Sequence, residues 1–547
     1  MATKYFRYSV LLLAVALLAG IAVAQVSPHG AQTIVVLPFE NGSRAPGLQW
    51  ISEAFPEVLG AKLASPMLYV ISREDRIYAF DRLGIPATVH PSRATLYRIA
   101  EQMDADYIVL GEYNFDGRTF SAQAQVLDMK RLRLSDATRA SGPLPTLLDV
   151  QRTIAWQLLK TIYPETLLAR DEFLRNDPPT RLDAFENYIR GVLAGTRQEK
   201  TRHFREAVRL NPQYTSAILQ LGKTYYAGRE YESAASWLSK VPKNHPASSE
   251  ANFLLGLTNY YQGQFEKAEA AFRVTERNVP LTEVYNNIGV VLSRRGRRTA
   301  IEYFQRAVQA DPNDIDYRFN LGAALYKNGD IAGATRQLRE AVARRPADAE
   351  AKQLLDSLVS GSAANLAKPE TPGTTPAVSA SSPAKVPMER IKRNYDETSY
   401  RQLALEVQNA MEQALEKTDP RTHAAAHVER GRELLNRGFT MDAEREFREA
   451  IMRDPVNAGA HAGMARVAEV NGNVAVARSE ADAALRLQPI ADAYVVLGNL
   501  DLKDNNVDSA SENADRALRL EPANPAAVAL RRSITTRRAG VPEPAQR

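Results

Sequence analysis

The sequence predicts an α+β multidomain protein, in which a small α/β amino-terminal domain precedes two all-α superhelical arrays of paired helices, joined by a disordered linker. Three observations carry this prediction. Strand and helix patterns alternate between residues 33 and 160, prolines recur at nearly fixed intervals over residues 212–346 and 455–522, and a stretch rich in Pro, Ala, Ser and Thr at 359–388 separates the two periodic regions. A period near 34 residues is typical of helix pairs that bury their apolar faces against neighbouring pairs.

Composition limits the classes of function. A chain of 547 residues is too long for one compact core, so several domains are expected. It holds 69 basic and 64 acidic residues, a net charge of +5, and the basic residues are spread through the predicted helices. This distribution argues against dedicated nucleic-acid binding. Because Cys is absent, the chain has no disulfide framework, thiolate metal site or cysteine nucleophile.

Residues 1–24 have the pattern of a Sec-type signal peptide. Lys4 and Arg7 precede an apolar run over residues 10–21, and residues 22–24 (Ala-Val-Ala) form a small-x-small cleavage site. The apolar run is short for a bilayer span, although an uncleaved membrane anchor is the alternative. We therefore expect an exported protein, periplasmic or secreted.

Residues 30–165 are predicted to form the small α/β domain. Its apolar runs of strand length and its helical patterns alternate along the chain. Asp116-Gly117 lies between two such runs and favours a tight hairpin. The expected strands are 33–39, 68–71, 107–113 and 119–126, and the expected helices are 51–63, 75–83 and 92–103.

Three short features give this domain a family resemblance. With Val36-Leu37-Pro38-Phe39-Glu40-Asn41 on the first strand, a middle strand ending at Ser72-Arg73, and a hairpin from Tyr107 to Asp128, it resembles the TolB amino-terminal, FlgO-like and CsgG-like group of envelope domains. The resemblance implies an assembly or interaction module of the bacterial envelope and supplies no catalytic residues. We expect no enzyme, no cofactor and no small-molecule substrate. The competing hypothesis is an enzyme with its active site in this domain and repeats that recruit substrate.

Residues 180–358 carry the first periodic array. In each of four units a glycine follows the proline by about ten residues, and an alanine follows that glycine by eleven or twelve. Small residues let two antiparallel helices approach closely, and the proline ends the second helix. With Asn320-Leu321-Gly322-Ala323-Ala324-Leu325-Tyr326, this stretch resembles the tetratricopeptide repeat (TPR) family. The glycines are Gly222, Gly256, Gly289 and Gly322, and the alanines are Ala234, Ala268, Ala300 and Ala334.

The resemblance also implies where a partner binds. In the family the first helix of each pair faces a concave groove that holds extended peptides or partner helices. We therefore expect a scaffold whose partners are peptide segments or helices of envelope proteins, bound in an aromatic groove with a few cations. For Phe253 and Phe319, packing between adjacent repeats is the alternative. The groove residues implied by offset are Lys223, Tyr226, Phe253, Tyr260, Tyr261, Asn286, Arg294, Phe319, Tyr326 and Lys327.

The remaining chain divides by composition. Residues 359–394 are predicted to be an extended linker, because they cannot bury enough apolar surface to offset their ordering entropy. Residues 395–535 recover the repeat offsets with proline steps of 34 and 33, and so predict a second TPR array. An amphipathic helix at 397–415 precedes its three repeats, a capping helix at 526–534 follows them, and 536–547 is predicted to be a disordered tail.

Three further motifs have ordinary structural interpretations. Gly222-Lys223-Thr224 lacks the second glycine and the preceding strand of a phosphate-binding loop. His423 and His427 have the i, i+4 spacing of helical metal ligands, but His427 and His461 occupy the same repeat position, which favours packing over a metal site. The basic cluster 294–298 suits a solvated turn, with contact to an acidic partner as the alternative.

Overall fold

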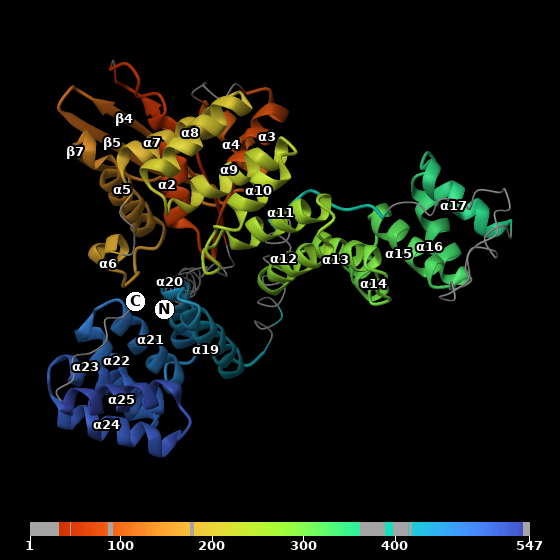
Figure 1. Ribbon diagram of the computed structural model, residues 1–547. Helices are drawn as coiled ribbons and strands as arrows, with labels where there is room; N and C mark the ends of the chain where they lie inside the picture. Colours follow the sequence, from red (N-terminus) through yellow and green to blue (C-terminus); the bar gives the residue numbers. More distant parts are fainter. Residues whose placement is uncertain are drawn as a thin grey trace, which may run out of the picture. The chain divides into compact units, whose positions relative to one another are not determined.

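A computed structural model of the chain describes residues 32–43, 45–85, 91–175, 180–360, 389–397, 414 and 418–539. The chain divides into two compact units (Figure 1). Unit 1 combines Met1–Asp177 with Gln402–Arg547, and unit 2 is Pro178–Arg401. The predicted signal peptide and most of the predicted helix at 397–415 lie outside the described residues.

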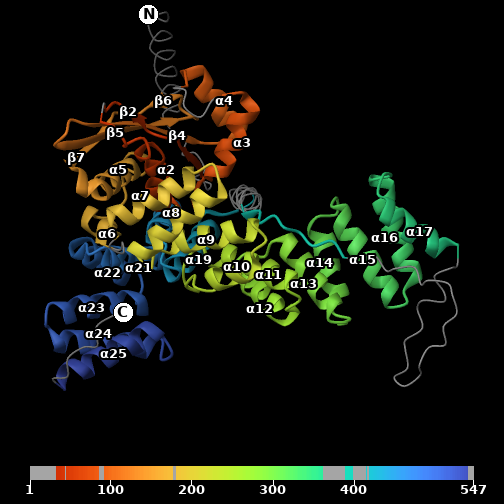
Figure 2. The same cartoon turned by 45° about the horizontal axis from the view of Figure 1, so that its top comes forward.

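The amino-terminal part of unit 1 is a seven-stranded sheet with helices on both faces (Figure 2). The strand order is β3-β1-β4-β5-β6, with β2 beside β4 and β7 beside β5; β1 is parallel to β3 and β4, and β4 and β5 form the predicted hairpin. This arrangement confirms the predicted α/β domain. The strands are β1 (Gln32–Val36), β2 (Glu40–Asn41), β3 (Leu68–Val70), β4 (Tyr107–Phe115), β5 (Thr119–Asp128), β6 (Arg133–Leu134) and β7 (Thr138–Pro143). The helices are α2 (Ile51–Leu63), α3 (Arg73–Leu83), α4 (Arg93–Met103), α5 (Leu147–Ile162) and α6 (Arg170–Arg175), with a 3₁₀ turn at Leu144–Thr146.

Side-chain alternation along the strands separates two apolar layers. Val35 and Ile108 pack against α3 and α4. On the opposite face, the Phe39 ring stacks on Phe55 of α2 with centroids 3.9 Å apart. A Cβ at Gly111 would lie 2.2 Å from the Phe39 ring, so the strand needs glycine there for this stack to form.

Unit 2 is the first helical array, built from consecutive helix pairs (Figure 1). Within a pair, the glycine of the first helix meets a large side chain of the second: a Cβ at Gly256 would lie 2.6 Å from the Phe272 ring, and one at Gly289 would lie 2.7 Å from Phe304. The predicted role of the small residues is confirmed by this close approach. The helices are α7 (Leu182–Leu193), α8 (Arg197–Leu210), α9 (Thr215–Ala227), α10 (Tyr231–Leu238), α11 (Ser248–Tyr261), α12 (Phe265–Asn278), α13 (Thr282–Arg294), α14 (Ala300–Ala310), α15 (Ile315–Lys327), α16 (Ile331–Arg344) and α17 (Ala349–Val359).

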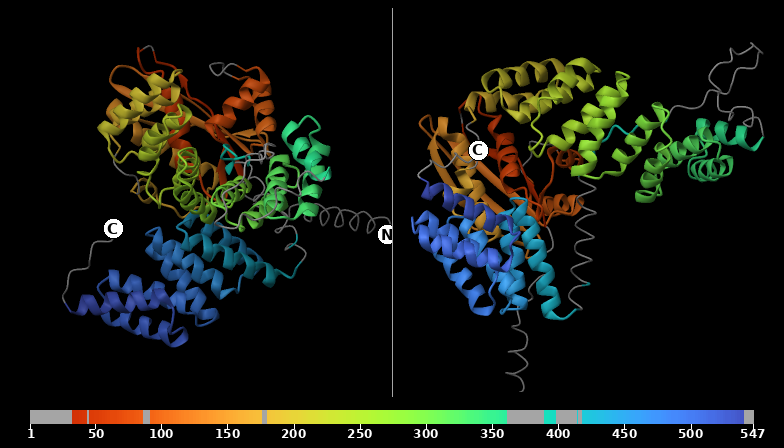
Figure 3. Two further views of the ribbon diagram at one scale, coloured as in Figure 1. Left: turned by 45° about the vertical axis from the view of Figure 1, so that its right-hand side comes forward. Right: turned by 60° about the horizontal axis from the view of Figure 1, so that its bottom comes forward.

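The second array belongs to unit 1 (blue in Figure 3). Its second pair is closed by alanine, because α22 buries Ala477, Ala481 and Ala484 and no larger side chain. In its first pair, a Cβ at Gly431 would lie 2.8 Å from the Phe447 ring. Helix α25 is longer than the predicted cap, so residues 536–538 of the predicted tail are helical. The helices are α19 (Pro420–Asn436), α20 (Thr440–Arg453), α21 (Ala458–Val470), α22 (Val474–Leu487), α23 (Ala491–Lys503), α24 (Val507–Leu520) and α25 (Pro525–Arg538).

Helix α20 connects the second array to the α/β domain. The buried Glu444 carboxylate accepts hydrogen bonds from the Leu167 amide at 2.9 Å and from the Thr166 hydroxyl at 3.2 Å. Asp442, also buried, accepts one from the Ser65 hydroxyl at 3.1 Å. The α/β domain and the second array are thus joined by buried carboxylates, which are costly to bury unless they are paired or protonated.

No helix among the described residues is both long enough and apolar enough to cross a membrane.

The Asp442 contact predicts a pH dependence. Burial raises the pKa of Asp442 to about 6, against the opposing effects of the Arg445 charge and the Ser65 hydrogen bond. Because this pKa lies above the unfolded value, the stabilisation from Asp442 is complete below about pH 4 and is lost as the pH rises through 6. The wild-type protein should therefore lose up to roughly 3 kcal/mol of unfolding free energy between pH 4 and pH 8 relative to Asp442→Asn.

Denaturant unfolding of both proteins across this pH range measures the difference. Asp482→Asn, which changes an exposed aspartate of the same array, is the matched control. Identical pH profiles for Asp442→Asn and wild type would contradict the buried contact.

Candidate peptide-binding face

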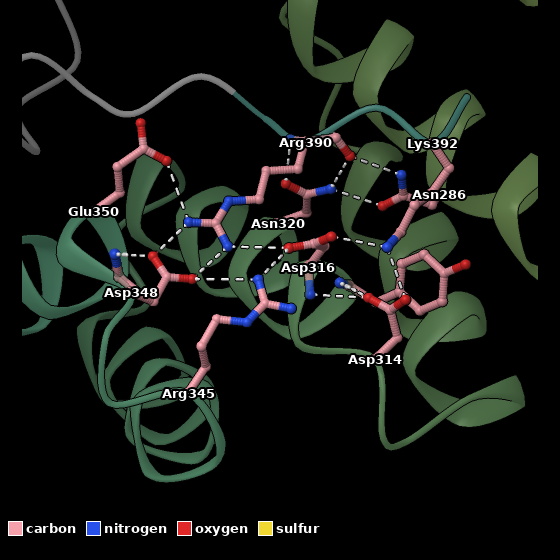
Figure 4. Close-up of polar contacts among 11 residues, drawn as sticks. Asn286, Asp314, Asp316, Asn320, Arg345, Asp348, Glu350, Arg390 and Lys392 are labelled. Atoms are coloured by element: carbon pink, nitrogen blue, oxygen red, sulfur yellow. Dashed lines mark hydrogen bonds and ion pairs between the residues drawn. The ribbon is translucent and has the colours of Figure 1, made fainter. Parts of the chain in front are cut away.

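An extended segment of the chain lies along the first helices of the first array. Residues 389–397, which we call the inner segment, contact α13, α15 and the start of α17 within unit 2 (Figure 4). We call the surface that these helices present to the segment, continued by α11, the segment face. The segment runs opposite to the order of the helices, since Arg390 lies at α15 and α17 whereas Asp396 donates its amide to Glu283 at the start of α13.

Asparagine side chains hold the main chain of the inner segment. The Asn320 amide accepts from the Arg390 N–H at 2.7 Å and donates to the Arg390 carbonyl at 2.8 Å. One repeat earlier, Asn287 makes the same two bonds to Lys392, both at 2.8 Å. Asn286 adds a second donor to the Arg390 carbonyl at 2.9 Å. These amides bind backbone groups that every residue type except proline presents in full, so they recognise an extended chain rather than a sequence.

Carboxylates pair with two of the three cations of the segment, Arg390 and Lys392. The Arg390 guanidinium forms a fork with Asp348, at 2.6 and 2.7 Å, and contacts Asp316 at 3.1 Å. Its Cζ atom lies 3.8 Å from the centroid of the Phe319 ring, which adds a cation–π contact. Lys392 Nζ lies 2.7 Å from Asp314 and 2.8 Å from Asp316. Asp316 therefore bridges both cations, and paired charges in this partly buried setting are held by hydrogen bonds as well as by attraction.

The amino-terminal end of the inner segment reverses the charge pattern. Glu389 is almost fully buried and its carboxylate pairs with Lys327, lies 3.2 Å from Arg294 Nε, and accepts a hydrogen bond from Ser293. A carboxylate enclosed by two cations at this place fixes the register of the segment. A one-residue shift in one direction would bring Arg390 toward Lys327 and Arg294, and a shift in the other would bring Glu389 toward Asp316 and Asp348.

The carboxy-terminal end of the inner segment meets aromatic rings. The Tyr395 ring packs 5.4 Å from Phe253 of α11, and the Arg393 guanidinium lies 5.5 Å from the Tyr261 ring. Tyr261 also stacks on Tyr231 at 5.0 Å. The aromatic part of the segment face thus provides broad apolar contact, whereas the α13–α17 part provides directed polar contact.

The pKa values of the charged groups shift as this pairing requires. The Arg390 hydrogen bond lowers the pKa of Asp348. Burial alone would raise the pKa of Asp316, yet hydrogen bonds from Lys392 and Arg390 lower it overall. For Glu389 the effect of burial is likewise overcome by Lys327 and Ser293, and the pKa falls. The stabilisation from these three carboxylates is present above about pH 4 and is lost as the pH falls through their lowered pKa values.

The ten residues implied by the TPR resemblance have several environments. Asn286, Arg294 and Lys327 contact the inner segment directly, as do the rings of Phe253, Tyr261 and Phe319. Tyr226 and Tyr260 lie beside Tyr261, with ring centroids 6.5 and 5.4 Å away, and Lys223 forms an ion pair with Glu250 at 2.6 Å.

Tyr326 differs from the expectation. Its ring is buried in the apolar cluster that α15 forms with α16 and α17, next to Ala334 and Leu338. The fixed sequence offset from Gly322 predicted that Tyr326 faces the groove, but the residue at that offset lies in the apolar core. Phe253 and Phe319 are fully buried as well, and each combines packing between helices with contact to the segment.

Sequence reasoning missed the residues that make most of the polar contacts. Asn287 and Asn320 interrupt apolar helical patterns with amides that no helix needs, and this was an available signal. Asp314 and Asp348 resemble ordinary helix N-caps, and both do cap helices, so their second role was hidden. Residues 389–394, which the composition assigns to the linker, instead lie on the segment face.

The other motifs have structural roles in the described residues. Lys223 and Thr224 lie inside α9. His427 Nδ1 lies 2.7 Å from Glu446, and His461 Nδ1 lies 2.7 Å from Glu480, so the two histidines make equivalent contacts one repeat apart. In the basic cluster, Arg295 pairs with Glu266 and Glu269, whereas Arg294 turns to Glu389.

Comparison with known families identifies the repeats. One tetratricopeptide repeat model matches residues 219–283 and 428–491, and a second matches residues 298–358. Both arrays therefore contain TPR repeats, and the interpretation of the period is confirmed. The matched residues all lie in the helical arrays, so the likeness of residues 30–165 to TolB-type domains stays a prediction.

Solved structures similar to parts of the chain share little sequence with it. MamA from Desulfovibrio magneticus RS-1 is 19% identical with a TM-score of 0.30, covering 31% of this chain and 99% of that one. YrrB, described as a TPR protein with an unusual peptide-binding site, is 20% identical with a TM-score of 0.27, covering 29% and 83%. The LpoB carboxy-terminal domain from Salmonella enterica is 13% identical with a TM-score of 0.19, covering 21% and 84%. No curated protein matches the chain.

The asparagine contacts give a direct prediction. Asn287→Ala or Asn320→Ala removes two hydrogen bonds to the inner segment, each contributing about 0.5–1.5 kcal/mol, so the segment should open more often. Amide hydrogen exchange of residues 389–397 should accelerate by about ten- to a hundredfold. Asn313→Ala, in an exposed turn of the same array, should leave this exchange unchanged. Equal exchange rates in all the variants would show that the asparagines do not hold the segment.

Proposed function

We propose that this protein, whose two arrays carry TPR repeats, is an exported scaffold or adaptor that mediates protein–protein interactions in bacterial envelope assembly or tethering. The observation that carries the proposal is the pair of asparagines, Asn287 and Asn320, each bonded to both backbone groups of one residue of an extended chain. The Asn320 amide also donates to the Asn286 oxygen at 2.7 Å, so the contact between α15 and α13 is continuous with the contacts to the segment.

Burial of these amides supports a binding role. Asn286, Asn287 and Asn320 have no exposed surface when the inner segment is in place. Buried amides without partners are costly, so the segment face favours an occupant that supplies backbone donors and acceptors. An extended peptide supplies both at every second residue along one edge. The segment face is therefore suited to bind extended parts of other proteins.

Export and an envelope setting rest on the amino-terminal sequence. The short apolar run, the Ala-Val-Ala site and the likeness of residues 30–165 to TolB-type, FlgO-like and CsgG-like domains all support an exported protein of the envelope. In this proposal the α/β domain and the second array form one structural body, and the first array presents the segment face to partners.

Site-specific crosslinking tests the scaffold function. A photoreactive phenylalanine analogue in place of Lys327, which lies on the segment face, should form adducts with another protein in envelope fractions of the producing bacterium. The same analogue in place of Arg336, exposed on the second helix α16, should form none. Adducts formed equally from both positions, or from neither, would contradict partner binding at this face.

Export makes a separate prediction. Cleavage after Ala24 should give a mature chain that begins at Gln25 and is recovered in the periplasmic or secreted fraction. Intact-mass measurement of the purified protein checks this. A mass that retains residues 1–24, together with recovery in membranes, would establish the uncleaved anchor instead.

A further inference from the structure

We propose that the inner segment is a tethered internal ligand, and that the partner of the segment face is an extended segment of another protein with the same charge order: an acidic residue, Arg, any residue, then Lys. This inference rests on the proposed function and specifies its partner. The partner binds by displacing residues 389–397 from the face.

The requirement for two cations follows from the carboxylates. Asp314, Asp316, Asp348 and Glu350 converge on Arg390 and Lys392, and Arg345 is the other described cation in contact with them, 3.5 Å from Asp316 (Figure 4). Without an occupant, four carboxylates would face one cation, and like charges at this distance repel. An occupant without two positive charges leaves that repulsion in place.

The spacing of the cations follows from the asparagine clamps. Asn320 fixes Arg390 and Asn287 fixes Lys392, which are alternate residues of an extended chain. Alternate residues of such a chain project their side chains to the same side. The face therefore selects Arg-x-Lys and disfavours an arginine moved to the position between the two clamps, because its side chain would point away from the carboxylates. Arg393, next to Lys392, lies against the Tyr261 ring instead.

The acidic residue sets the start of the pattern. The Glu389 side chain is 1% exposed and sits between Lys327 and Arg294. A neutral residue there would leave these two cations close together without a counter-charge, and a basic residue would add to the repulsion.

Arginine is favoured over lysine at the second position, since the planar guanidinium makes both the fork with Asp348 and the cation–π contact with Phe319.

The covalent connection of the inner segment to the array determines how binding to the segment face is regulated. A ligand on the same chain has a high effective concentration, so it excludes weak or incomplete matches. A partner must outcompete Glu389, Arg390 and Lys392 together. The inner segment thus sets the minimum affinity that a partner needs. Substitutions that weaken its contacts with the segment face should allow ligands in solution to bind.

The test uses a fluorescent synthetic peptide with the sequence of residues 388–397 and the full mature chain. Its affinity is measured by fluorescence anisotropy for wild type and for the triple variant Glu389→Ala, Arg390→Ala, Lys392→Ala, which alters the segment and leaves the face intact. We expect the variant to bind the peptide about tenfold or more tightly than wild type does. A peptide of the same composition in which Arg390 and Ile391 exchange places, so that the arginine no longer occupies the first clamp position, is the matched control and should bind at least about tenfold more weakly.

Further variants and measurements locate the binding. Adding Asp316→Asn and Asp348→Asn to the triple variant should abolish peptide binding, while circular dichroism melting confirms that the array remains folded. Equal affinity of wild type and triple variant would overturn the internal-ligand proposal. Equal binding of the control peptide would overturn the charge order.

Two outcomes separate this inference from the scaffold function. If the triple variant does not bind the peptide, but the photoreactive analogue in place of Lys327 still forms adducts with an envelope protein, the charge order is wrong and the scaffold function stands. If light scattering shows that wild type is a dimer and the triple variant a monomer, the segment is exchanged between two copies, and the internal arrangement is overturned.

Discussion

The close approach of the two helices within each repeat is the contact on which the first array depends. Gly256 and Gly289 leave no room for a side chain against Phe272 and Phe304, so these two pairs close through the same kind of contact. Successive helix pairs of similar geometry stack at regular intervals, so equivalent positions of their first helices are aligned. Asn287 and Asn320, 33 residues apart in sequence, can therefore bind alternate residues of one extended chain.

The two arrays share a fold but differ in the chemistry they present. By offset from the small residue of each first helix, the positions of Asn286 and Asn287 are taken in the second array by Val428 and Glu429, then by Ala462 and Gly463, and then by two valines. Those residues offer no amide to a peptide backbone. The second array instead buries carboxylates of α20 against the α/β domain, whereas α22 and α24 bury alanines. Function is thus set by a few residues on a common scaffold.

Local signals predicted the fold well and the segment face only in part. The helix at 51–63 and the repeat helices follow from periodicity and small residues, which act over one or two turns. Contact between Arg390 and Asp348 depends on residues that composition places in separate regions, and no local pattern encodes it. Tyr326 shows a different limit of sequence reasoning. An offset taken from the family indicates only approximately which side of a helix a residue occupies, and the Tyr326 ring packs into the neighbouring apolar cluster.

The direction of the inner segment gives the first array a polarity. Each clamp bonds the N–H and the carbonyl of the same residue, and the order of charges from Glu389 to Lys392 matches ions placed successively along the face. A chain laid in the reverse sense would meet those ions in the wrong order. Whatever precedes the bound residues must therefore leave from the carboxy-terminal ends of α13 and α15, where Glu389 is held, and whatever follows must leave toward α11, where Tyr395 packs on Phe253. The array does more than hold an extended chain: it also sets the direction in which that chain runs.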